Sequence, residues 1–378
     1  MIPRSADPRF IRQWNEYVVF DVLRGAGAPQ RVSELSKGTG LTAASLGQVL
    51  RGLAAKGWVT SVESVEQRRG RPAQVYSLRR QPGAVLGLDV GVHAVRAVRM
   101  TLDGETLVRA ETRFEQGSSG QERVDIVEQL VGEVLFGVED EPVWLSGLAL
   151  KRDAESEKLG EAIEARLPSR CKLVTDVNAD TWAEHIEGGA KGHDDVLLVH
   201  LGWQPWLGLL LDGQPRGGAH GAAGDLPWDS LLPGVEQMEW PDRLLKERDG
   251  WIYDIVAAAK DGDEDAVAAT TQYMRAVLPA VVFATAIVDP KVVVLGGAFS
   301  PVAHLGVDLV VEALGKRMGD PPQVVKSGLD QYSSALGAAH LARQEVLAAV
   351  VSPTEGVLPI SDMPDDFFTL PQEDDQSA

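Results

Sequence analysis

The first 80 residues have the apolar spacing of a small helical domain. Residues 12–27 and 31–40 each predict a helix that ends at glycines. Residues 41–59 predict a third helix, with Thr42 as its N-cap and Gly57 as its stop. Two short helices joined by a tight turn indicate a helix-turn-helix.

The third predicted helix has one clear core face. Its apolar side chains stand at i, i+3, i+4 and i+7, namely Leu46, Val49, Leu50 and Leu53. With this stripe turned inward, helix geometry points Gln48 and Arg51 outward and leaves Ser45 to the side.

A hairpin follows the helices. Residues 58–62 and 75–78 predict two strands, and the polar run between them holds Arg68, Arg69 and Arg71. A hairpin after such a helix pair is typical of a wing. An ordinary small helical domain with a hairpin is the alternative.

The pattern changes after a linker at residues 79–85. Strict alternation and a turn at Asp103-Gly104 predict a three-stranded meander up to residue 114. Helices and strands then alternate to residue 350, which indicates an α/β body. The predicted helices are 121–138, 156–167, 180–188 and 334–350, and the predicted strands are 143–150, 172–179, 196–202, 207–213 and 291–300.

Charge separates these parts. The 378 residues carry a net charge of −19, yet residues 1–80 hold 13 Lys and Arg against 6 Asp and Glu. A basic domain on an acidic body suggests a domain that binds a polyanion, joined to a body that does not contact the polyanion. Chance variation of surface charge is the alternative. We expect domains at 1–80 and 84–352, and an acidic, disordered tail at 353–378.

Cysteine usage and hydropathy suggest a compartment. The single cysteine, Cys171, allows no internal disulfide, no charged-then-apolar leader opens the chain, and no uncharged run reaches the roughly 20 residues of a membrane span. We expect a cytoplasmic protein with no membrane contact.

Four segments of the body carry candidate chemistry, in a specific order. They are the glycine turns at 88–93, 200–208 and 295–300 and the segment TDVNAD at 175–180. With the helix-turn-helix before them, they resemble the ROK family (repressors, open reading frames, kinases), in its transcriptional-regulator branch, from about Val18 to Val350. The resemblance implies a winged helix-turn-helix and an actin-like, hexokinase-like body of two lobes, in which the kinases bind ATP and a hexose.

The resemblance also implies that the phosphate turns are degraded. Of the kinases' D-x-G-G-T turn this chain keeps Asp89 and Gly91. In place of G-T-G-x-G-x-G, a turn whose bare N–H groups approach phosphates, the chain places two tryptophans and a proline that cannot donate. We predict that Trp203 and Trp206 occlude the former nucleotide site.

The family's sugar and zinc residues are also mostly changed. The residues that match the sugar pocket form a candidate effector site: Thr175, Asp176, Asn178, Asp225 and Trp228. Asp176 matches the kinases' general base, and a helix N-cap is its other interpretation. Trp228 stands where the zinc histidine would be and no cysteine loop follows, so we expect no metal and no cofactor.

The candidate DNA contacts lie in the first domain. Gln48 can form two hydrogen bonds with adenine, and Arg51 can bind a phosphate of the DNA backbone. Arg69-Gly70-Arg71-Pro72 resembles an AT-hook core suited to a narrow minor groove, although a solvated basic turn is the alternative. The full candidate set is Thr42, Ser45, Gln48, Arg51, Arg68, Arg69 and Arg71.

The function predicted is that of a sequence-specific DNA-binding transcriptional regulator, expected to be a repressor. It would be no enzyme, and its kinase-like body would serve oligomerisation and effector sensing. Partners would be double-stranded DNA with a pseudo-palindromic operator, a small-molecule effector and further copies in a homodimer or tetramer. The alternatives are an active sugar kinase with an accessory DNA-binding domain and a pure protein-interaction module.

Overall fold

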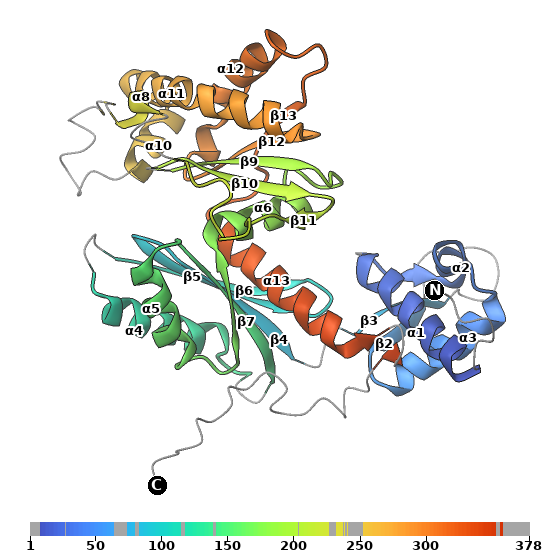
Figure 1. The fold of residues 1–378 in the computed structure, drawn as a ribbon. Helices are drawn as coiled ribbons and strands as arrows, with labels where there is room; N and C mark the ends of the chain where they lie inside the picture. The colour runs from blue at the N-terminus through green and yellow to red at the C-terminus, as the bar shows by residue number, and fades with distance from the viewer. Residues whose placement is uncertain are drawn as a thin grey trace.

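Three units follow one another along the chain: an N-terminal helical domain and two α/β lobes (Figure 1). The protein is seen here in a computed structural model. The residues described are 8–26, 28–63, 74–79, 83–114, 118–138, 141–202, 204–226, 232–236, 238, 240, 252–352 and 356–357.

The N-terminal unit has the predicted helix-turn-helix and hairpin. Its helices are α1 (Pro8–Gly25), α2 (Val32–Thr39) and α3 (Ala43–Ala55), and its strands are β1 (Gln30–Arg31), β2 (Val59–Glu63) and β3 (Gln74–Leu78). The strands form a sheet of order β1-β3-β2, in which β2 and β3 pair antiparallel. The hairpin tip lies outside the described residues, and with it Arg68, Arg69 and Arg71.

Local signals set the ends of α2 and α3. Gly40 adopts a left-handed conformation after α2, and its N–H donates to the carbonyl of Ser36. Thr42 caps α3, since its side chain accepts a hydrogen bond from the Ser45 N–H. The predicted stripe of Leu46, Val49, Leu50 and Leu53 is buried, which confirms the core face.

The first lobe is a five-stranded sheet of order β6-β5-β4-β7-β8. Its strands are β4 (Ala84–Val90), β5 (Ala94–Thr101), β6 (Thr106–Arg113), β7 (Val143–Leu150) and β8 (Cys171–Thr175). The meander β4-β5-β6 is antiparallel as predicted, while β7 and β8 are parallel to β4. One face carries Leu86 and Leu88 against α4 (Gly120–Val134) and α5 (Ala154–Glu164).

The second lobe repeats this arrangement with order β11-β10-β9-β12-β13. Its strands are β9 (Val196–Leu201), β10 (Trp206–Leu211), β11 (Gln214–Pro215), β12 (Val292–Gly297) and β13 (Gln323–Lys326). As in the first lobe, three strands are antiparallel and the last two are parallel to the central one. Two lobes with this shared strand order make the body an actin-like fold, as the sequence predicted.

Alternation along β9 explains the layers of the second lobe. Leu197 and Val199 face a core shared with the helices of the outer layer, whereas Val196 and Leu198 pack on Trp182. Trp182 belongs to α6 (Asp176–Ile186), on the inner face. The outer layer contains α10 (Ile252–Lys260), α11 (Glu264–Val288) and α12 (His304–Gly315), while α8 (Pro233–Glu236) lies beside α11 and η1 (Ser300–Val302) precedes α12.

Helix α13 (Ser333–Val350) joins all three units (Figure 1). It crosses the first sheet so closely that glycine is needed there, because a Cβ on Gly87 would lie 2.0 Å from the Ala335 carbonyl oxygen. A Cβ on Gly147 would lie 2.1 Å from the Ala338 oxygen. The same helix packs along α6 and ends beside the N-terminal domain.

A short sheet at the C-terminal end connects the body to α1. Strands β14 (Val351–Ser352) and β15 (Gly356–Val357) pair antiparallel and contact α1. Val357 is 1% exposed within the core of the N-terminal domain. The sequence assigned Val357 to a tail from 353, which the structure corrects, because its apolar side chain completes that core. Residues 353–355 and 358–378, the rest of that tail, lie outside the described residues.

Helix α11 is long and apolar enough to cross a membrane by composition alone. In this fold it is a core helix of the second lobe, where Tyr273, Met274 and Val277 are buried against the sheet. Its outer side exposes Phe283 and Ile287.

Candidate functional site

The exposed face of α3 presents the predicted DNA-contacting residues. Thr42, Gln48 and Arg51 are exposed and Ser45 is half-buried. Thr42 already uses its hydroxyl as the helix cap and lies 3.1 Å from the Ser45 hydroxyl. Gln48 and Arg51 therefore remain as the side chains best placed to reach a ligand, and their DNA contacts stay predictions.

Inside this domain a buried ion pair supports the helix that carries these residues. Glu16 on α1 is 7% exposed and accepts a hydrogen bond from Lys56, at the end of α3, at 2.6 Å. The pair fixes α3 against α1, so the exposed face of α3 has a defined direction.

A second candidate site is a pocket at the carboxyl edge of the first sheet. Its space, with the open mouth included, is about 330 Å³. It brings together four of the five residues proposed for an effector: Thr175, Asp176, Asn178 and Asp225. The fifth, Trp228, lies outside the described residues.

Helix α6 begins earlier than the sequence predicted. It starts at Asp176, not at 180, and Thr175 is its N-cap, accepting a hydrogen bond from the Asn178 N–H at 3.3 Å. The N-cap interpretation of Asp176 is therefore wrong. Asp176 is the first helical residue and accepts from the Val177 N–H, and burial raises the pKa of its carboxyl.

Two cations that the sequence analysis missed also line this pocket. Lys151 and Arg152 follow directly after β7. The signal that could have found them is topological, because the carboxyl ends of parallel neighbours such as β7 and β8 meet at one edge of a sheet. Arg152 lies 3.8 Å from Asp225, which lines the pocket from the loop of residues 216–226.

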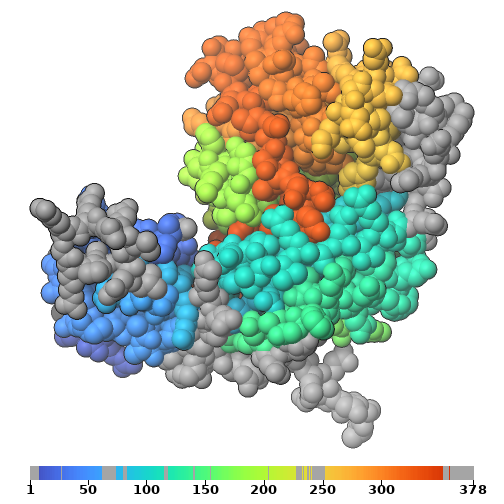
Figure 2. Space-filling model, turned by 180° about the vertical axis from the view of Figure 1, so that it is seen from behind, coloured from blue at the N-terminus to red at the C-terminus, as the bar shows by residue number. Residues whose placement is uncertain are grey.

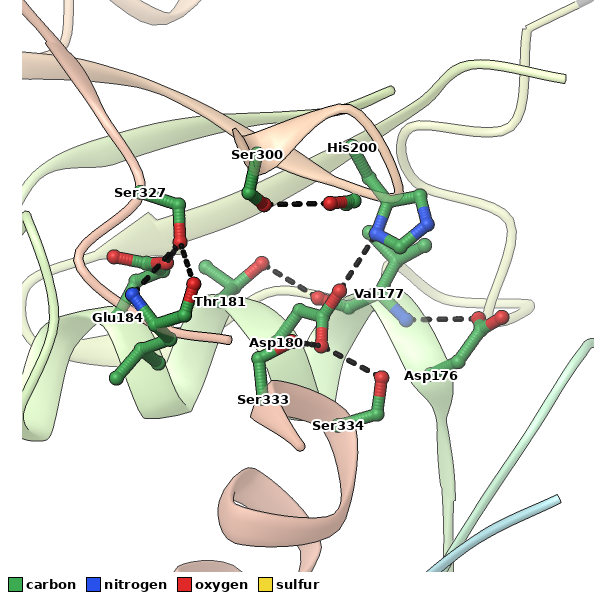
Figure 3. A network of polar contacts seen from close by, with 12 residues as sticks. Asp176, Val177, Asp180, Thr181, Glu184, His200, Ser300, Ser327, Ser333 and Ser334 are labelled. Carbon is green, nitrogen blue, oxygen red and sulfur yellow. Dashed lines mark hydrogen bonds and ion pairs between the residues drawn. The ribbon is translucent and has the colours of Figure 1, made fainter. Parts of the chain in front are cut away.

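Beside the pocket, Asp180 organises a buried polar network (Figure 3). One carboxylate oxygen accepts from the hydroxyls of Ser333 and Ser334, at 2.7 and 2.6 Å, and the other lies 2.6 Å from Nδ1 of His200. Burial opposes the charge on Asp180, yet the hydrogen bonds from His200 and the serines hold its pKa below the usual value.

The same hydrogen bond acts on the pKa of the histidine. Burial alone would lower the pKa of His200, but the hydrogen bond to Asp180 raises it to about 8. The network thus links the end of β9, helix α6 and the first turn of α13 (Figure 3).

A third polar cluster bridges the two lobes. Arg96 on β5 forms ion pairs with Asp89 at 3.0 Å and Glu111 at 2.7 Å, and it donates to the hydroxyl of Tyr253, on α10 of the second lobe, at 3.3 Å. Burial raises the pKa of Asp89 to about 6 against the opposing effect of Arg96. Arg113 stacks on the same tyrosine, 5.7 Å from its ring centre.

The turn between β9 and β10 is short. Trp206 pairs with His200 across the two strands, and the hydroxyl of Tyr273 donates to the Gly202 carbonyl at 2.5 Å. Trp206 is half-buried and lines the pocket beside Asp176. Trp203 lies outside the described residues, so occlusion of a nucleotide site stays a prediction.

Within the ranges given above, no three His, Cys, Asp or Glu side chains are placed to hold a metal ion.

A helix-turn-helix with a β-hairpin, joined to two actin-like lobes, defines the class of protein: an actin-like body that carries a small N-terminal helix-turn-helix domain. The chain belongs to the ROK family, whose model matches residues 149–227 and 236–345, half of the chain.

A curated relative supports this assignment. The xylose repressor of Bacillus subtilis strain 168 is 20% identical over 238 residues, which are 58% of this chain and 61% of the repressor. The chain thus spans about three fifths of the length of that curated relative.

Among solved structures, a ROK family transcriptional regulator, a homologue of the E. coli MLC protein, has a TM-score of 0.63 at 19% identity over 89% of this chain and 97% of its own. A ROK glucokinase from Streptomyces griseus, in complex with glucose and AMPPNP, has a TM-score of 0.56 at 23% identity over 69% and 100%. These two structures show the fold.

Proposed function

We propose that the protein is a sequence-specific DNA-binding transcriptional regulator, acting in the cytoplasm as a repressor. The observation that carries this is the exposed polar face of α3, with Gln48 and Arg51, beside a hairpin whose tip sequence is rich in arginine. An α-helix fits the major groove, and a basic wing can reach the neighbouring groove or backbone. The xylose repressor supports the same role.

The kinase-like body is proposed to be catalytically inactive. Phosphoryl transfer depends almost wholly on positioned groups that stabilise charge on the phosphates. Here Arg96 already neutralises Asp89, the carboxylate of the first phosphate turn, and Pro205 removes a backbone donor from the second. The retained Asp176 is what favours the alternative, an active sugar kinase with an accessory DNA-binding domain.

Oligomerisation is proposed to use the outer face of the second lobe. Phe283 and Ile287, one turn apart on α11, are 60% and 67% exposed, and Val311 on the neighbouring α12 is 46% exposed. Large exposed apolar side chains on two neighbouring helices favour a protein partner. A second copy with two-fold symmetry would place two recognition helices on two half-sites of a pseudo-palindromic operator.

Effector sensing is proposed to act through α13. At one end, Ser333 and Ser334 bind Asp180 beside the pocket. At the other end α13 leads into the β14–β15 pair, which packs on α1 of the N-terminal domain. The N-terminal domain projects from one side of the body (Figure 2). A small rotation of α13 would therefore move this domain as a rigid unit.

The test is a pair of assays on the full chain. Labelled duplexes selected from a random pool report DNA recognition, and a coupled assay with ATP and a panel of hexoses reports kinase activity. The proposal expects retained duplexes that share one motif and no phosphorylation. Hexose phosphorylation that is lost in Asp176→Asn supports the kinase instead, and retention of neither duplex nor activity favours the interaction module.

A further inference from the structure

The pocket beside Asp176 carries charges that a neutral sugar does not require. Lys151 and Arg152 stand on one side of it, at the end of β7. Lys151 has no ion-pair partner within 4 Å among the residues that the structure describes. Within the described part of the chain, the ion-pair partner of Arg152 is the exposed Asp225, at 3.8 Å, which is too long for a hydrogen bond.

The acids of the pocket do not cancel these cations. Asp176 has one oxygen committed to the Val177 N–H, and burial raises the pKa of its carboxyl, while His200 and Lys151 act in the opposite direction. Asp225 lies at the mouth and pairs only weakly with Arg152. Lys151 and Arg152 at the β7 side of the pocket therefore have N–H donors that neither of these two acids accepts.

The rest of the wall suits a hydroxylated molecule. Asn178 and Thr175 supply an amide and a hydroxyl at the start of α6, while Trp206 and Leu207 form an apolar side. A pocket that combines an amide and a hydroxyl with an aromatic side chain is typical of a site for a small polyhydroxylated ligand.

We propose that the effector is an acidic sugar derivative whose carboxylate or phosphate binds between Lys151 and Arg152, with its hydroxyls against Asp176 and Asn178. The inference rests on the proposed function, since it takes this pocket as the effector site. An arginine and a lysine on one loop bind an anion through charge-assisted hydrogen bonds. Asp225 acts as a competing internal anion that the ligand displaces from Arg152.

Isothermal titration of the full chain without DNA tests the ligand class. Each acid is compared with its neutral parent: hexuronates and aldonates for the carboxylate, and hexose and pentose phosphates for the phosphate. At least one acid should bind about tenfold or more tightly than its parent, and the pair that shows it identifies the anion.

Variants make the assignment specific. Lys151→Ala and Arg152→Ala should each weaken the acid about tenfold and leave the neutral parent unchanged, whereas Asp225→Asn should tighten the acid. Lys158→Ala, which removes an exposed cation on α5 away from the pocket, is the matched control and should change nothing.

The inference is overturned if no acid binds more tightly than its neutral parent at millimolar concentration, or if the Lys151 and Arg152 variants bind the acid as the unaltered chain does. Duplex retention, measured separately, distinguishes this failure from failure of the proposed function. Acid binding without DNA recognition leaves the ligand class standing and removes the regulator.

Discussion

Arg96 illustrates how one side chain changes what a cleft can do. Its guanidinium forms an ion pair with the carboxylate of Asp89 and also donates a hydrogen bond to the hydroxyl of Tyr253 on the other lobe. Breaking such a buried pair leaves an uncompensated charge, so the contact is costly to open. A phosphate that needed Asp89 would have to displace an internal cation first.

The His200–Asp180 pair predicts a pH dependence of stability. Because the folded-state pKa of His200 is raised to about 8, its contribution is complete below the unfolded value of 6.5 and is lost as pH rises through 8. Between pH 6 and 9 the free energy of unfolding should fall by about 2 kcal/mol. The groups whose charges act on His200 are Asp180, Asp176 and Asp89.

Urea denaturation at the two pH values measures this. His200→Asn keeps a donor for Asp180 but cannot titrate, so its unfolding free energy should lack that decrease. An equal decrease in the variant would assign the pH dependence to other groups.

Gln48 should determine base preference. Gln48→Ala should relax discrimination at one central position of each half-site by about 1–3 kcal/mol and leave the salt dependence of binding unchanged. Competition binding with single-base operator variants checks this. Arg51→Ala is the contrasting variant, because loss of a phosphate contact should weaken all duplexes alike and lower the salt slope. A uniform loss in Gln48→Ala contradicts the assignment.

Sequence reasoning found the side chains whose roles depend on near neighbours and missed those placed by topology. The stripe from Leu46 to Leu53 follows from spacing alone and is confirmed. The contact between Arg96 and Tyr253 spans 157 positions, and no local pattern encodes it.

Helix α6 shows a further limit of reading patterns. The β-branched residues Val174, Thr175 and Val177 favoured an extended segment, whereas the Thr175 hydroxyl caps a helix that begins at Asp176. The longer strands and most helices were predicted because their periodicity is long and regular, whereas the short strands β1, β11, β13, β14 and β15 were not. The start of α6 was not, because a single side-chain hydrogen bond decides it.

Helix α13 should tolerate no added volume where it crosses the first sheet. Gly87→Ala places a Cβ 2.0 Å from the Ala335 carbonyl oxygen, so α13 must shift, and the cost should reach the upper part of about 1–3 kcal/mol. Thermal unfolding measures the loss. If α13 carries the effector signal, the same change should also reduce the effect of ligand on DNA affinity.

Gly132→Ala on α4 is the control for this change. A Cβ there meets nothing within 4 Å, so the variant should be stabilised by about 0.5–1 kcal/mol. Similar effects of the two substitutions would show that α13 is not held closely to the sheet.

The whole molecule combines a basic reading domain with an acidic, duplicated body. Residues 1–80 carry a net charge of +7 and the remainder −26. The negative charge of the body is repelled by the DNA phosphates, so the N-terminal domain alone is expected to contact the duplex. Affinity for a specific site then depends on bringing two such domains together.

The exposed face of α11 should hold the two copies. Phe283→Glu should raise the dissociation constant of the dimer about 100-fold, because it places a charge in an apolar interface. Sedimentation velocity measures this. Phe136→Glu, which alters an apolar residue that is 85% exposed beyond α4 on the other lobe, is the control and should leave the dimer intact. A monomeric unaltered chain at micromolar concentration would contradict the assignment.

Selection of duplexes from a random-sequence pool by the full chain tests the central claim most directly. The account predicts that recovered duplexes converge on one pseudo-palindromic motif with A·T-rich flanks, and that Gln48→Ala/Arg51→Ala binds all duplexes more weakly and loses the preference at the central position of each half-site while the fold is retained. Recovery of duplexes without a shared motif, or the same motif from the double variant, would contradict it.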